Sequence, residues 1–98
     1  MKLLAFAASN SLNSINRALV DYAAQRAVAL SDSPIEIQTL DINDFEMPIY
    51  SGAREAADGV PQLAKDLFAK IGAADAVMIA FPEHNGSVSA AWKNIFDW

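Results

Sequence analysis

The 98-residue sequence predicts an α/β fold in which helices cover a parallel β-sheet. Two short apolar runs without alternation, Lys2–Ala8 and Ala76–Phe81, are typical of strands buried on both faces. A third run, Ile35–Leu40, alternates apolar and polar residues, which indicates a strand with one wetter face or an edge strand. Helical patterns fill the gaps between the runs, and strands that alternate with helices favour right-handed parallel crossovers.

Three helices are predicted between and after these strands. The first begins after a capping Ser14, and its apolar residues at helical spacing are Ile15, Leu19, Tyr22, Ala23, Ala27 and Leu30. The second begins at Asp58 and Pro61, ends at Gly72, and has a single stripe formed by Val60, Leu63, Ala64, Leu67 and Ile71. The third runs from about Val88 to Trp98. The long segment Asp41–Gly59 is predicted to be a functional or mobile loop.

The strand patterns also predict the order of the sheet and its extent. Two buried runs and one edge run fit the spatial order 2-1-3, which would leave the third strand as an exposed, hydrophobic edge. Natural proteins avoid such edges, so we expect more strands to follow. Residues 1–98 are therefore predicted to be the N-terminal part of a single domain, and a complete small protein is the alternative.

Composition excludes several classes of function. Seven basic residues against 12 acidic ones give a net charge of −5, which argues against a nucleic-acid or membrane-surface partner. The chain has no cysteine and one histidine, so disulfides, thiolate nucleophiles and Cys- or His-rich metal sites are excluded. The apolar N-terminal run is too short for a secretory leader, and no run is long enough to span a bilayer. We expect a cytoplasmic protein.

Two unusual loops follow the first and third predicted strands, at the sheet edge where open α/β folds bind ligands. Ser9–Asn16 is rich in Ser and Asn, carries no charge and precedes a helix, so it can cradle a phosphate or simply cap that helix. Pro82–Ser87 contains the turn signal Asn85-Gly86 and can grip a flat heteroaromatic edge. The alternative for this second loop is a plain turn in which Ser87 caps the next helix and His84 lies on the surface.

Together the two loops resemble the NADPH-dependent FMN reductase family, whose fold is flavodoxin-like. The family pattern S-x-R-x-x-S-x-N-x-x-L is matched by Ser9, Ser14, Asn16 and Leu19. The pattern P-E-Y-N-G-S, followed by a helix ending K-N-x-x-D-W, is matched by Pro82, Glu83, Asn85, Gly86, Ser87, Lys93, Asn94, Asp97 and Trp98. Two positions depart from it, because Ser11 replaces the arginine and His84 replaces the tyrosine.

The resemblance implies an FMN-dependent NAD(P)H oxidoreductase with the strand order 2-1-3-4-5 when complete. NADPH or NADH would reduce bound FMN, which would pass electrons to a quinone, azo, metal-oxyanion or flavin acceptor, with no catalytic side chain and no metal. The implied cofactor-binding residues are Ser9, Ser11, Ser14, Ile15 and Asn16 in the first loop and Pro82, Glu83, His84, Asn85 and Gly86 in the second.

Partners and alternatives follow from the same patterns. The resemblance implies a homodimer or homotetramer, and in the last helix Trp92 and Phe96 form a stripe that we expect at a subunit interface. The alternative is that a later part of the same chain covers this stripe. A flavodoxin-type electron carrier is the alternative function. A signalling receiver domain is excluded, because the strand ends at Ala7–Ser9 and Ala80–Pro82 lack acidic residues.

Overall fold

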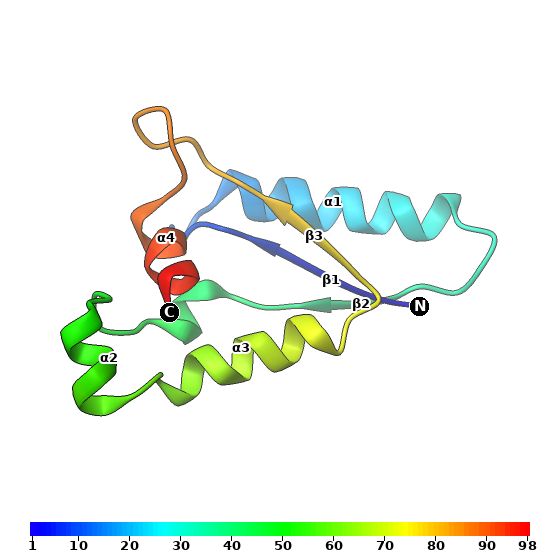
Figure 1. Ribbon diagram of the computed structural model, residues 1–98. Helices are drawn as coiled ribbons and strands as arrows, with labels where there is room; N and C mark the ends of the chain where they lie inside the picture. The colour runs from blue at the N-terminus through cyan, green and yellow to red at the C-terminus, as the bar shows by residue number, and fades with distance from the viewer.

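The computed structural model describes all 98 residues and has the predicted α/β architecture. Figure 1 shows a twisted sheet with a long helix on one face and the other helices on the opposite face. In chain order the elements are β1 (Lys2–Ala7), α1 (Ile15–Leu30), β2 (Glu36–Thr39), the short 3-10 helix η1 (Ile42–Phe45), α2 (Gly52–Asp58), α3 (Gln62–Gly72), β3 (Ala76–Ala80) and α4 (Ala90–Asp97).

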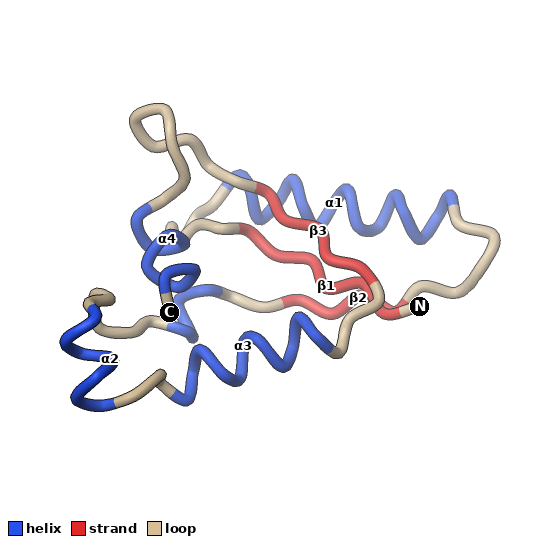
Figure 2. Tube along the Cα trace, viewed as in Figure 1, coloured by secondary structure: helices blue, strands red, loops and turns tan.

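The three strands are parallel and lie in the order β2-β1-β3, as predicted (Figure 2). Leu3 of β1 pairs with Ile37 of β2 and with Ala76 of β3, so the carboxyl ends of the strands share one edge. β3 has a free side, and Val77 in it is 40% exposed. This arrangement is the flavodoxin-like start that the sequence predicts.

The side chains of β1 alternate between two hydrophobic clusters, one on each face of the sheet. Leu3 and Ala5 pack against Val20 and Ala24 of α1. On the opposite face a larger cluster joins β1 to η1, α3 and α4, and its buried members are Leu4, Phe6, Leu40, Ile42, Phe45, Met47, Leu67 and Ile95. The central strand is thus buried on both faces, as its continuous apolar run indicates.

The predicted buried stripe of α1 is wrong for four of its six residues. Val20 and Ala24 face the sheet, and the exposed residues are Ile15 (82%), Leu19 (59%), Tyr22 (65%) and Leu30 (73%). The helix is apolar on two sides, so spacing alone could not select the side that faces the strands. The side with the smaller side chains, Val20 and Ala24, faces the sheet, because these side chains let the helix pack closely against the strands.

The later helices follow the predicted stripes with shifted starts. In α3, Leu67 is buried and Gly72 is the last residue, whereas Leu63 is 37% exposed. α4 begins at Ala90 with Ser89 as its N-cap, rather than near Val88.

Trp92 and Phe96 of α4 line the same apolar groove, but only Phe96 is fully on the surface. Its ring is half-buried, 5.6 Å from that of Phe6 and 6.0 Å from that of Phe81. Phe96 is 73% exposed. The ring of Trp92 is therefore covered in part by Phe6 and Phe81 of its own chain, and the rest of it lines the groove.

The segment predicted as a long loop, Asp41–Gly59, is largely ordered. It contains η1 and α2, whose N-termini are capped by the side chains of Asp41 and Ser51. Polar residues and isolated apolar ones conceal these short helices from periodicity arguments. None of the helices is both long enough and apolar enough to cross a membrane.

Candidate functional site

The two predicted loops leave the sheet at the same point, beside Ala8. The N–H of Ala8 donates to the carbonyl of Ala80 over 2.9 Å, at the start of the second loop. The hydroxyl of Ser89 donates to the carbonyl of Ala8 over 2.7 Å, at the end of that loop. The parallel register of β1 and β3 thus brings the two loops together, although they are far apart in the sequence.

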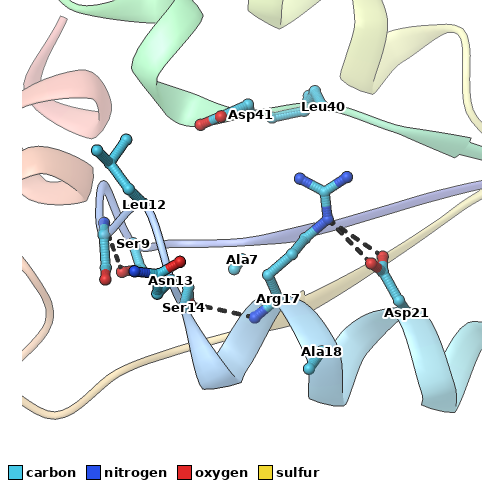
Figure 3. Close-up of a pocket in the computed structure, with 11 residues that line it drawn as sticks. Ala7, Ser9, Leu12, Asn13, Ser14, Arg17, Ala18, Asp21, Leu40 and Asp41 are labelled. Atoms are coloured by element: carbon cyan, nitrogen blue, oxygen red, sulfur yellow. Dashed lines mark hydrogen bonds and ion pairs between the residues drawn. The ribbon is translucent and has the colours of Figure 1, made fainter.

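The first loop presents a set of free hydrogen-bond donors before α1. Ser9 is 8% exposed and its Oγ accepts from the N–H of Ser11 over 3.1 Å. Ser14 caps the helix by accepting from the N–H of Arg17 over 3.2 Å, as predicted (Figure 3). The backbone N–H groups of Leu12, Asn13, Ile15 and Asn16 donate to no acceptor in the chain. Such donors at the positive end of a helix dipole favour an anion.

A cavity of about 300 Å³ opens beside this loop. Figure 3 shows most of its lining, which comprises Ala7, Ser9, Ser11, Leu12, Asn13, Ser14, Arg17, Ala18, Asp21, Leu40 and Asp41. Arg17 is its basic residue and pairs with Asp21 over 3.0 Å. The predicted residues Ser9, Ser11 and Ser14 therefore share one cavity, whereas Ile15 and Asn16 lie outside its lining and Ile15 is exposed.

The second loop is a tight hairpin turn, as the Asn-Gly pair predicts. His84 and Ser87 exchange two backbone hydrogen bonds of 2.8 and 3.1 Å. Asn85 and Gly86 both have positive φ, 52° and 80°. The carboxylate of Glu83 accepts from the N–H of Gly86. The side chain of Glu83 thus stabilises its own turn.

The two loops that carry the predicted cofactor residues lie together where they leave the sheet, but their outer ends are apart. Pro82 is half-buried, and residues 83–86 are exposed on a hairpin that projects from the body of the molecule (Figure 1). The cavity beside the first loop does not reach them. Residues 82–86 thus lie outside this cavity, and the hairpin is joined to the first loop by hydrogen bonds at Ala8.

The K-N-x-x-D-W motif has a role that the sequence reasoning missed. The Asn94 side chain accepts from the N–H of Tyr50 over 2.8 Å and donates to the carbonyls of Met47 and Pro48 over 3.2 Å each. The indole N–H of Trp98 also donates to Pro48, over 2.9 Å. These bonds clamp residues 47–50 against α4. An amide and an indole four residues apart on one helix were the available signal.

The clamp also involves the aromatic ring of Tyr50. That ring meets Trp98 edge-on, with centroids 5.0 Å apart. The hydroxyl of Tyr50 donates to Glu55 over 2.9 Å, and this hydrogen bond, together with the negative charge of Glu55, raises the pKa of Tyr50. The neutral tyrosine is therefore the form that ties residue 50 to α2.

Comparison with known proteins identifies the family of the chain. The family model described as NADPH-dependent FMN reductase matches residues 1–98. The chain belongs to the NADPH-dependent FMN reductase family. Members of this family use FMN with NAD(P)H as the electron donor.

Several curated relatives of the FMN reductase family are similar over the whole chain. A probable NADPH:quinone oxidoreductase of Oryza sativa is 32% identical over 98 residues, covering all of this chain and 47% of that protein. An NAD(P)H-dependent FMN reductase of Pseudomonas aeruginosa is 33% identical, covering all of this chain and 49% of that protein. The chain spans about half the length of the curated relatives it matches.

Proposed function

We propose that this chain is the FMN-binding N-terminal part of an NAD(P)H-dependent oxidoreductase. The observation that carries the proposal is the set of unpaired N–H groups from Leu12 to Asn16, which lie at the start of α1 beside a hairpin turn. This donor set fits a phosphate monoester, because each N–H can donate to a phosphate oxygen without displacing an existing bond. When bound, FMN supplies the redox chemistry by accepting a hydride and passing on electrons.

The first loop would hold the phosphate by neutral donors. Ser9 and Ser14 present hydroxyl groups next to the free N–H groups, and Ser11, in the place of the family's arginine, adds a hydroxyl without a charge. Arg17 contributes the positive charge nearest to the loop, although Asp21 already pairs with it. Phosphate affinity is therefore expected to depend on hydrogen-bond geometry and the helix dipole more than on ion pairing.

The hairpin would hold the ring system. Its backbone groups and the Asn85 amide, which makes no hydrogen bond within the chain, suit the polar edge of a flavin. His84 is exposed at the tip and can pack on one side of the ring. No side-chain acid or base is required of this chain, because the hydride passes between nicotinamide and flavin.

The sheet is proposed to continue past β3 in the order 2-1-3-4-5. The free, partly exposed apolar edge of β3 supports this, as does the greater length of the relatives. We also propose a small-molecule acceptor, with a quinone favoured because several relatives carry quinone-reductase names. Azo compounds, metal oxyanions and free flavins are the other acceptors to compare.

The decisive experiment is to purify the full-length protein, record its absorption spectrum and identify the ligand released on denaturation. We expect a flavin spectrum, released FMN, and oxidation of NADPH or NADH when a quinone is added. Bound FMN without NAD(P)H oxidation would instead identify an electron carrier. A colourless protein that binds no added FMN would overturn the proposal.

Ser14→Ala should weaken FMN binding and leave riboflavin binding unchanged, because riboflavin lacks the phosphate. The loss of one hydrogen bond is worth roughly 0.5–1.5 kcal/mol, which corresponds to about two- to tenfold in Kd. Fluorescence titration with both ligands measures this. The matched control is Ser51→Ala, which removes the equivalent cap of α2. Equal losses for FMN and riboflavin would contradict the phosphate assignment.

We further propose that the protein is a homodimer or homotetramer whose interface includes Phe96. Phe68 (79% exposed) and Phe96 (73%) border an apolar groove of about 510 Å³ between α3 and α4. Phe96→Glu should shift the full-length protein to monomer in sedimentation experiments at micromolar concentration, whereas Tyr22→Glu on α1 should not. A wild-type protein that is already monomeric would refute the interface.

A further inference from the structure

Both ends of the hairpin loop are hydrogen-bonded to a single residue, Ala8, which directly follows β1. Its N–H binds the carbonyl of Ala80, before the hairpin, and its carbonyl binds the hydroxyl of Ser89, after the hairpin. Ala8 is fully buried and immediately precedes Ser9, the first residue of the phosphate loop. Both ends of the hairpin loop are therefore hydrogen-bonded to Ala8, the residue that directly precedes the phosphate loop.

Ser89 is the side chain that makes this fastening. It is 1% exposed, donates to Ala8 over 2.7 Å and accepts from the N–H of Trp92 over 3.2 Å. The second bond caps α4, which is an ordinary task for serine. The first bond is not needed for capping, because the cap requires only an acceptor. The hydroxyl proton of Ser89 is thus used only in the hydrogen bond to Ala8, which joins the two loops.

We propose that Ser89 is a positioning residue that fixes the hairpin relative to the phosphate loop, so that one FMN molecule engages both. This inference rests on the proposed function, since it assigns the phosphate to one loop and the ring to the other. Two linked subsites bind a two-part ligand tightly only when their separation is held. The affinity of a ligand that contacts only one loop should not depend on the hydrogen bond between the loops.

The test compares three ligands on the full-length protein and its Ser89→Ala variant. FMN spans both loops, riboflavin probes the hairpin, and inorganic phosphate probes the first loop. We expect Ser89→Ala to raise the Kd of FMN about three- to tenfold and to leave riboflavin and inorganic phosphate within about twofold. Flavin fluorescence and phosphorus NMR supply the readouts, neither of which depends on activity.

The matched control is Ser51→Ala, which removes the cap of α2 but no link between loops. It should leave all three affinities unchanged. If Ser89→Ala does not fold, Ser89→Cys replaces it, since the thiol preserves the volume and donates only weakly. The same selective loss of FMN affinity is expected.

Two results would overturn the assignment of Ser89. Unchanged binding of all three ligands would reduce the residue to a helix cap, and an equal loss for all three would show general damage to the site. A wild-type protein that binds neither FMN nor riboflavin is a different failure, because it removes the proposed function itself. The wild-type titration therefore separates the two hypotheses.

Discussion

Phe6→Ala is expected to lower the free energy of unfolding by about 3–5 kcal/mol. Phe6 is fully buried near the C-terminal end of β1 and belongs to the larger hydrophobic cluster, where α3, α4 and η1 converge. Its ring lies 5.6 Å from that of Trp92. Removing it leaves a cavity that neighbours on three elements cannot fill together. Because small domains are stable by only about 5–15 kcal/mol, the variant is expected near the limit of folding.

Urea denaturation followed by circular dichroism measures the change. The control is Tyr22→Ala, because Tyr22 is 65% exposed on α1, away from the proposed interface, and should contribute little. A double-mutant cycle with Trp92→Ala should give a coupling of about 0.5–1.5 kcal/mol between the two rings. A loss below about 1 kcal/mol for Phe6→Ala would show that this cluster is not the core of the chain.

Asn94→Ala is expected to cost about 1.5–4 kcal/mol, the second-largest effect. It removes three hydrogen bonds that hold residues 47–50 against α4 and leaves the N–H of Tyr50 without a partner. The segment should loosen locally before the domain unfolds. Denaturation gives the global cost, and hydrogen exchange of the Tyr50 amide reports the local opening.

Two variants on the same helix sharpen this second prediction. Asn94→Asp keeps the acceptor for Tyr50 but loses both donors, so an intermediate cost is expected. Lys93→Ala removes an exposed ion pair with Asp97 and should change stability by no more than about 0.5 kcal/mol. If Asn94→Ala changed the free energy of unfolding as little as Lys93→Ala, the hydrogen bonds that hold residues 47–50 would not contribute to stability.

Some features of the site were predictable because they depend on neighbours in the chain. Asn85-Gly86 specifies a turn with positive φ, and Ser14 caps the helix that begins at the next residue. Both need only a few adjacent residues. The clamp by Asn94 and the hydrogen bond from Ser89 to Ala8 span 44 and 81 residues, so local patterns do not show which residues these side chains join.

The sequence by itself determined the α/β class, the order of the strands and of the three longer helices, and the two loops at the sheet edge. These follow from hydrophobic periodicity, since a strand buried on both faces must be apolar throughout, as Lys2–Ala8 and Ala76–Phe81 nearly are. Tertiary structure alone decided which side of α1 is buried, where Trp92 packs and how the two loops are joined at Ala8. A helix with two apolar sides has several local solutions of similar energy, and so does a helix such as α4 that either Ser87 or Ser89 could cap. Only the contacts of the folded chain distinguish them.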